Sequence, residues 1–161
     1  MSPAHAVVVR NTSNVTVVRS FLIMIESRTQ VRVRYGETDK MGFVYYGNYA
    51  LYLEVGRAEA MRQIGLSYKE MEDLGIIMPI SHLELKYVSP ARYDDLLTVI
   101  TTVRELPAAR MLFEYEIHKP GNILVCKAKT TLAFINHTTG RPVPAPKWFL
   151  DKLSSYFTNQ N

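Results

Sequence analysis

Several features that would indicate other classes of protein are missing from this sequence. It contains one cysteine, Cys126, so no internal disulfide can form and a reducing, cytoplasmic setting is expected. No apolar run approaches the roughly 20 residues that a membrane-spanning helix needs, so we expect no integral membrane segment. The net charge is +4, yet the basic residues form no long run, which argues against nucleic acid as a partner. His82, His118 and His137 lack the spacing of metal ligands, so we expect no metal site.

The length and composition are those of one globular domain. The chain has 161 residues, of which 47% are hydrophobic and 21% charged. Residues 1–28 differ from the rest, because arginines interrupt their short apolar clusters and they make a poor secretory signal. We expect an N-terminal extension that is disordered or that lies upstream of a true start at Met24; an organellar transit peptide is an open alternative. Residues 29–145 form the predicted domain, and residues 146–161 a C-terminal helical tail.

A strand and then a long helix open the predicted domain. The segment TQVRVRY, residues 29–35, alternates apolar and basic side chains as a half-buried strand does. From Asn48 the apolar period becomes helical. The apolar stripe of this helix consists of Tyr49, Leu53, Gly56, Ala60 and Ile64. Because Gly56 and Ala60 are small, the helix can lie close to a sheet. A second, shorter helix is predicted after Ser67, which forms a capping-box pattern with Glu70.

Four strand candidates follow the helices and are separated by turn residues. They occupy residues 77–88, 95–106, 110–119 and 122–136. Strands joined by short turns pair antiparallel, so the pattern predicts an antiparallel meander. The fold class is therefore α+β, with one antiparallel sheet wrapped around one long helix. The helix covers only one face of the sheet, so we expect a homodimer or a larger assembly such as a homotetramer.

The stretch YGETDKMGFVYYGNY, residues 35–49, sets one acid, Asp39, just ahead of the predicted helix. Together with the residues that follow it, through LSYKEMEDLGI and LKYVSPARYDDLL, it is similar to the 4-hydroxybenzoyl-CoA thioesterase branch of the hotdog-fold superfamily. The similarity is greatest to the bacterial acyl-CoA thioesterases associated with the Tol-Pal system, and it runs from about Thr29 to Ile135.

The resemblance implies hydrolysis of a thioester between an acyl group and coenzyme A or acyl-carrier protein. It implies no metal or redox cofactor, because coenzyme A is part of the substrate. In family members the acid that matches Asp39 is the catalytic carboxylate, and the backbone amide that matches Tyr46 polarises the thioester carbonyl. The Tol-Pal branch commonly has histidine where this chain has Tyr46, whereas the hydroxybenzoyl branch has tyrosine.

Elementary chemistry gives these residues separate tasks. Asp39 can deprotonate water or attack the acyl carbon itself, and the sequence does not choose between the two. The first amides of a helix have no partner within it and can stabilise an oxyanion. The expected substrate-binding residues are Gly42 and Gly47, whose backbone can approach a ligand closely, and Val44, Tyr45 and Asn48 around them.

Other interpretations of the same residues stay open. On spacing alone an aspartate before a helix is a turn or capping residue, and only the surrounding motif favours catalysis. Asn48 could cap the helix, Tyr49 is expected in the core, and Glu54 is expected to pair with Arg57. A non-catalytic acyl-CoA-binding module is the alternative to an enzyme, because one fold serves many functions. A hotdog dehydratase is disfavoured, since the motif contains no histidine.

Overall fold

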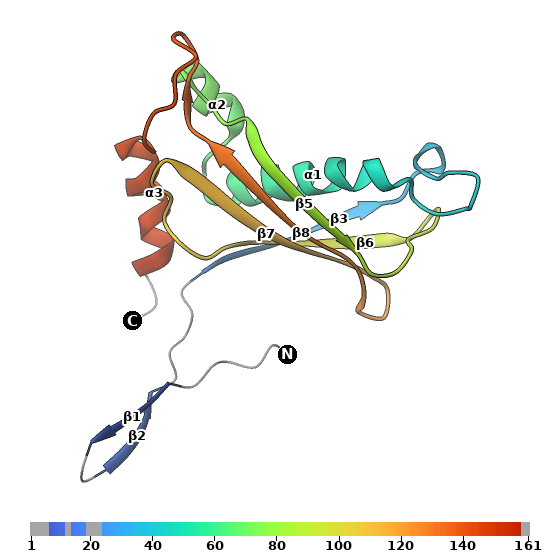
Figure 1. The fold of residues 1–161 in the computed structure, drawn as a ribbon, viewed down its shortest axis with the longest axis horizontal. Helices are drawn as coiled ribbons and strands as arrows, with labels where there is room; N and C mark the ends of the chain where they lie inside the picture. Colours follow the sequence, from blue (N-terminus) through green and yellow to red (C-terminus); the bar gives the residue numbers. More distant parts are fainter. Residues whose placement is uncertain (1–6, 12–13, 19–23, 159–161) are drawn as a thin grey trace.

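The computed structural model describes residues 7–11, 14–18 and 24–158, in which a long helix lies across a curved sheet (Figure 1). The elements in chain order are β1 (Val7–Asn11), β2 (Asn14–Val18), β3 (Ile25–Arg32), the 3-10 helices η1 (Tyr35–Glu37) and η2 (Tyr46–Asn48), α1 (Tyr49–Gln63), α2 (Tyr68–Asp73), β4 (Ile76–Ile77), β5 (Ile80–Tyr87), β6 (Leu96–Val103), β7 (Arg110–Lys119), β8 (Ile123–Ala133), β9 (Ile135–Asn136) and α3 (Lys147–Thr158). The predicted α+β class is confirmed. None of the helices in the described residues is long and apolar enough to cross a membrane.

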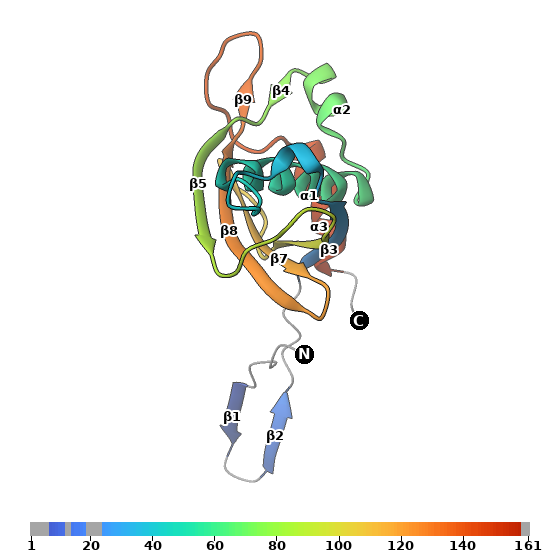
Figure 2. The same ribbon diagram turned by 90° about the vertical axis from the view of Figure 1, so that its right-hand side faces the viewer.

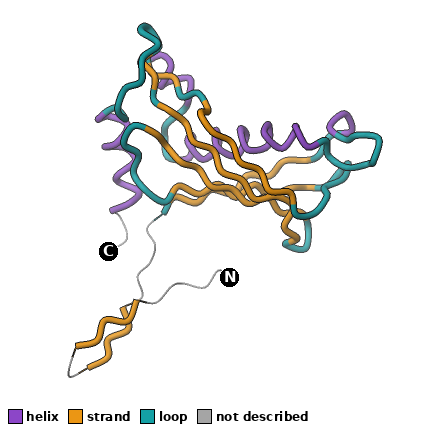
Figure 3. The backbone as a smooth tube through the Cα atoms, in the orientation of Figure 1, coloured by secondary structure: helices purple, strands orange, loops and turns teal. Residues whose placement is uncertain are grey.

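Five strands form one antiparallel sheet in the order β3-β6-β7-β8-β5, and this sheet curves around α1 (Figures 2 and 3). The order corrects the predicted meander: β5 pairs with β8 at the far edge and not with β6, its successor in the chain. Residues 88–95 are the reason. They cross the ends of the intervening strands instead of making a tight turn, and this crossing brings them beneath the Asp39 segment, where the Val44 amide donates to the Ala91 carbonyl.

The first strand of the sheet begins earlier and ends earlier than predicted. It starts at Ile25, which pairs with Val103, so β3 reaches into the range assigned to the N-terminal extension. The same range contributes β1 and β2, which pair with each other; its other residues before Met24 lie outside the described part. Tyr35 is not on the buried face of the strand. It lies in η1 and its side chain is 79% exposed, because the chain turns away from the sheet after Val33.

The predicted apolar stripe of α1 is buried at all five positions. Gly56 allows the closest approach to the sheet: a Cβ atom there would lie 2.6 Å from a Val99 methyl carbon and 2.8 Å from the Thr101 hydroxyl. The expected pairing of Glu54 with Arg57 is wrong. Arg57 is buried, and its guanidinium carbon lies 5.7 Å from the centre of the Tyr68 ring, while the Glu54 side chain is exposed.

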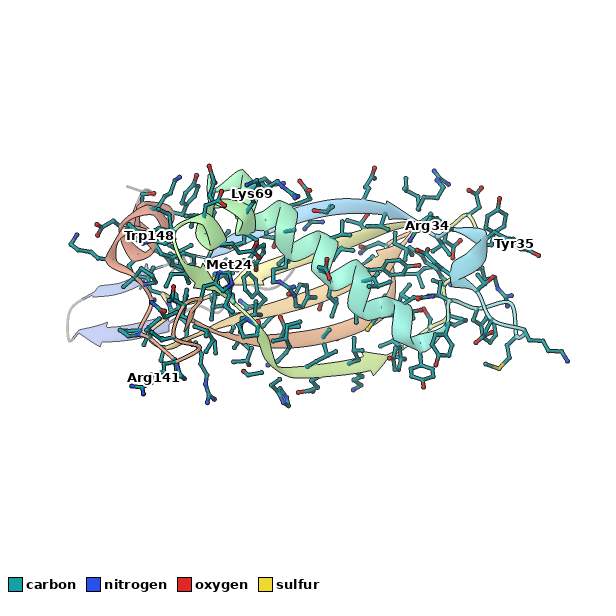
Figure 4. All side chains as sticks on the ribbon, turned by 90° about the horizontal axis from the view of Figure 1, so that it is seen from above. Met24, Arg34, Tyr35, Lys69, Arg141 and Trp148 are labelled. Carbon is teal, nitrogen blue, oxygen red and sulfur yellow. The ribbon has the colours of Figure 1, made fainter. Side chains whose placement is uncertain are left out.

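The ends of α1 lie at opposite ends of the molecule (Figure 4). Arg34 and Tyr35 mark the end at which α1 begins, and Lys69 and Trp148 mark the end occupied by α2 and α3. The capping box at the start of α2 is confirmed, with the Ser67 hydroxyl accepting from the Glu70 amide. Most of the predicted tail is α3, which buries Phe149 and Leu153 fully in the core.

Candidate active site

Asp39 opens a tight turn ahead of α1. The Asp39 amide donates to the Phe43 carbonyl at 2.8 Å, and the Gly42 amide donates back to the Asp39 carbonyl at 2.9 Å. Gly42 has φ +75°, a conformation that glycine adopts readily. The Asp39 carboxylate accepts a hydrogen bond from the Met41 amide at 2.8 Å through Oδ1. The side chain therefore does stabilise a turn, as spacing alone indicated, and this bond also orients the carboxylate.

The turn leads into the 3-10 helix η2, which precedes α1 directly. The first hydrogen bond within this turn runs from the Asn48 amide to the Tyr45 carbonyl, so the Tyr46 and Gly47 amides come before the first internal donor. Asn48 does not cap α1. Its side-chain amide donates instead to the Glu37 carbonyl at 2.8 Å, which corrects the capping interpretation.

Glu37 is the residue that holds this region together, and the sequence motif did not identify it. Its side chain is only 7% exposed. Oε2 accepts hydrogen bonds from the Arg34 amide at 2.8 Å and from the Tyr52 hydroxyl at 2.7 Å, and Oε1 pairs with the Arg34 guanidinium at 2.6 Å. The Glu37 carbonyl accepts from the Tyr45 amide at 2.8 Å as well as from Asn48. Glu37 thus joins the start of η1, α1 and the Tyr45–Asn48 turn.

The electrostatics of this cluster follow from its hydrogen bonds. Burial alone would raise the pKa of Glu37, but the Arg34 amide, the Tyr52 hydroxyl and the Arg34 guanidinium together hold that pKa below its ordinary value of 4.5. Burial, and then the bond to Glu37, raises the pKa of Tyr52. At neutral pH the pair is therefore a carboxylate that accepts from a neutral phenol.

A cleft of about 300 Å³ opens beside Asp39. It is lined by Asp39, Met41, Phe43, Val44, Tyr46, Tyr49, Tyr87, Val88, Ser89 and Pro90. Of the predicted site residues, Asp39, Val44 and Tyr46 are in the lining. The other four, Gly42, Tyr45, Gly47 and Asn48, lie in the same two turns but are not in the lining. Tyr45 packs against Tyr46 with ring centres 4.4 Å apart.

Sequence reasoning missed one wall of this cleft. Tyr87, Val88, Ser89 and Pro90 come from the end of β5 and the crossing segment, about 40 residues after the motif. Tyr49 faces the cleft although it is 3% exposed, so its predicted place in the core is confirmed without excluding it from the site. Cys126 is buried, and burial raises the pKa of its thiol to about 11, so it is not a reactive thiolate at neutral pH. In the described residues no cluster of His, Cys, Asp or Glu could hold a metal ion.

One long helix wrapped by an antiparallel sheet, with a carboxylate ahead of its first amides, defines a hotdog-fold protein with a candidate hydrolytic site. The chain belongs to the thioesterase-like superfamily, whose family model matches residues 33–153. This confirms the resemblance that the motif indicated.

Individual relatives cover most of the chain. It is 30% identical to the YneP protein of Bacillus subtilis, over 81% of this chain and 94% of the relative. It is 31% identical to the acyl-CoA thioesterase YbgC of Haemophilus influenzae, over 73% of this chain and 86% of the relative. The solved structure of a DHNA-CoA thioesterase from Staphylococcus aureus matches with a TM-score of 0.76 and 35% identity, over 81% of this chain and 88% of that chain.

Removal of the Tyr52 hydroxyl should destabilise the fold in a pH-dependent way. Tyr52→Phe is expected to lower the free energy of unfolding at pH 7 by about 1.5–3 kcal/mol, because a buried bond to a carboxylate is lost. Since the folded-state pKa of Glu37 is lowered, the stabilisation by its charge is complete above about pH 4.5 and is lost as the pH falls through that lowered pKa. Urea denaturation from pH 7 to pH 3 should therefore show the two proteins converging in acid. Tyr156→Phe, at an exposed tyrosine of α3, is the control, and an equal effect of both changes would contradict the prediction.

Proposed function

We propose that this chain hydrolyses acyl-CoA thioesters to a free acid and coenzyme A. The observation that carries the proposal is that Asp39 and the exposed residue Tyr46 line one cleft, directly ahead of the long helix. The names of the relatives support the same reaction, since YbgC of Haemophilus influenzae is an acyl-CoA thioesterase. Hydrolysis of an acyl-carrier-protein thioester is the alternative, because the acyl chemistry would be the same.

In this proposal Asp39 activates the nucleophile or is the nucleophile. As a base it removes a proton from water while the water oxygen attacks the acyl carbon and the thiolate of coenzyme A leaves. As a nucleophile its oxygen attacks the acyl carbon and forms an anhydride as the C–S bond breaks and the thiolate of coenzyme A leaves, and water then cleaves the anhydride to the free acid and Asp39. The bond from the Met41 amide occupies Oδ1 and leaves Oδ2 without a partner among the described residues, so Oδ2 is the oxygen we assign to the reaction.

Besides a base or nucleophile, thioester hydrolysis needs a group that stabilises negative charge on the thioester oxygen, and we propose that the start of the helix provides it. The Tyr46 and Gly47 amides donate no hydrogen bond to a described backbone carbonyl outside their helix, and they lie at its positive end. Amides held in place before the reaction stabilise an oxyanion without further reorganisation. Tyr46 therefore acts through its backbone, and histidine at this position in other family members is not required for this task.

The lining of the cleft favours a compact acyl group. Tyr46, Tyr49, Tyr87 and Phe43 contribute aromatic side chains to the lining, and the part of the cleft formed by one chain has a volume of about 300 Å³, at the lower end of the range for small-molecule sites. We propose aromatic or short aliphatic acyl groups as the preferred class. The DHNA-CoA thioesterase of Staphylococcus aureus, at 35% identity, supports the aromatic option.

A second copy is proposed to complete the cleft along the edge strand β5. The uncovered face of the sheet already carries ion pairs, such as Glu116 with Lys127 and Glu114 with Lys129, so it does not need a partner. The edge strand β5 differs, because seven of its eight residues are exposed and they include Ile80, Leu83 and Tyr87. The cleft opens beside Tyr87 at the end of this strand.

The first test is thiol release by purified wild type and Asp39→Asn from a panel of aromatic, short aliphatic and long aliphatic acyl-CoA. We expect turnover by wild type and a loss of at least about 10²-fold in kcat in the variant, because the base or nucleophile is gone. Asparagine retains an oxygen for the Met41 amide, so folding and binding of a non-hydrolysable thioether analogue should persist. Asp73→Asn, at the far end of the molecule, is the matched control. An inactive wild type that still binds acyl-CoA would indicate a binding module.

One of the two proposed oxyanion donors, the Tyr46 amide, can be removed without changing the turn. Tyr46 is the first residue of η2, where proline is tolerated, and Tyr45 already has φ −57° and ψ 132°, which suits a residue before proline. Tyr46→Pro removes the amide hydrogen and the phenol, whereas Tyr46→Ala removes only the phenol. We expect kcat of Tyr46→Pro to lie about 10²- to 10³-fold below that of Tyr46→Ala. Equal kcat values in two folded variants would rule out this amide as the donor.

The proposed assembly predicts a mass of two or more chains in light scattering after size exclusion. Leu83→Lys adds a charge to the exposed edge strand and should shift the protein to one chain with reduced activity. Leu112→Lys is the matched control, since Leu112 is similarly exposed, at 38% against 40%, but lies on β7 inside the sheet. A wild type that runs as one chain would refute the proposed assembly.

A further inference from the structure

Tyr87 contacts the turn at the start of α1 although it lies outside the Asp39 motif. It is the last residue of β5 and lines the cleft together with Asp39 and Tyr46. Its hydroxyl donates a hydrogen bond to the Tyr46 carbonyl oxygen at 3.1 Å. We propose that Tyr87 is a positioning residue. It holds the peptide group between Tyr46 and Gly47 in the orientation that directs the Gly47 N–H at the thioester oxygen. This inference rests on the proposed thioesterase function.

The geometry of the peptide bond explains why an anchored carbonyl matters. The Tyr46 carbonyl and the Gly47 amide belong to one planar trans peptide group, so the C=O and N–H bonds point in opposite directions. Fixing the oxygen therefore fixes the direction of the Gly47 N–H. A carbonyl that accepts a hydrogen bond also polarises its peptide group and makes the N–H a better donor. Glycine has no side chain to restrict this peptide, so the restriction must come from a neighbour.

Tyr87 is itself held by rigid parts of the fold. Its ring meets Tyr49 edge-on, with ring centres 5.2 Å apart, and Tyr49 is 3% exposed. In the sheet Tyr87 pairs with Cys126, which is fully buried. Partial burial raises the pKa of Tyr87, so its hydroxyl keeps its proton at neutral pH. The turn is thus fastened on two sides: Glu37 holds the Tyr45 amide, and Tyr87 holds the Tyr46 carbonyl.

A different role would give different kinetics. The Tyr87 side chain is 48% exposed and faces the cleft, so its ring or hydroxyl could contact the substrate directly. A contact that is equally strong in the ground state and the transition state changes KM and leaves kcat unchanged. A positioning residue for the oxyanion site acts in the transition state and changes kcat.

The test is Tyr87→Phe, which removes the hydroxyl and keeps the ring against Tyr49. We expect kcat to fall about 5- to 10-fold, the effect of one neutral hydrogen bond, with KM unchanged and the protein still folded. Tyr93→Phe makes the same chemical change at an exposed tyrosine whose ring packs on Tyr35, and it should match wild type. In protein labelled with ¹³C at the Tyr46 carbonyl, the chemical shift should move in Tyr87→Phe and stay in Tyr93→Phe.

Each contrary outcome has a defined meaning. An unmoved carbonyl signal, an unchanged kcat, or a raised KM with kcat intact would overturn the positioning role while the thioesterase function stands. A wild type that releases no thiol from any substrate of the panel would refute the proposed function, and the catalytic role of Tyr87 with it. The wild-type assay therefore separates the two failures before any variant is compared.

Discussion

The candidate site depends on one buried interaction, the hydrogen-bonded carboxylate of Glu37. It accepts from Arg34, which follows β3, and from Tyr52 in α1, so the segment after the strand is fixed to the helix. Its own carbonyl then holds Tyr45 and Asn48, the two sides of the turn before α1. A buried charge is costly unless it is paired and bonded, and Glu37 is both. The same bonds that stabilise the charge therefore set the geometry of the cleft.

Two acids only two positions apart have different surroundings, which is why we propose different roles for them. Glu37 is 7% exposed, and both of its oxygens have described partners. Asp39 is half-buried, lines the cleft, and has a described partner on one oxygen alone. A carboxylate whose acceptor sites are all filled cannot take a proton from water without breaking a bond, whereas Asp39 has an oxygen available. The contrast supports the proposal that Glu37 stabilises the structure and that Asp39 takes part in the reaction.

The sequence predicted features that follow from local periodicity and motifs, and it missed features that depend on contacts between residues far apart in the chain. Periodicity identified the buried stripe of α1, including Gly56, and the motif selected Asp39 and Tyr46, which line the same cleft. It could not show the position of β5 beside β8, since an eight-residue connection allows either a turn or a crossing. The burial of Glu37 could not be seen in the motif, because its partner in the helix, Tyr52, is 15 residues away. Tyr87 reaches the turn across 41 residues, and local pattern carries no information over that separation.

The position of Tyr87 links assembly to chemistry. It ends the edge strand β5, where we place a second copy, and its hydroxyl holds the carbonyl beside the proposed oxyanion amides. A strand that paired with β5 would bury the exposed side of Tyr87 and limit the motion of its ring. Water would then be excluded from the bond to Tyr46, and a hydrogen bond is electrostatically stronger in a drier setting. A second copy at this edge would therefore do two things. It would form one side of the cleft, and it would strengthen the hydrogen bond from Tyr87 that orients the turn of the proposed site.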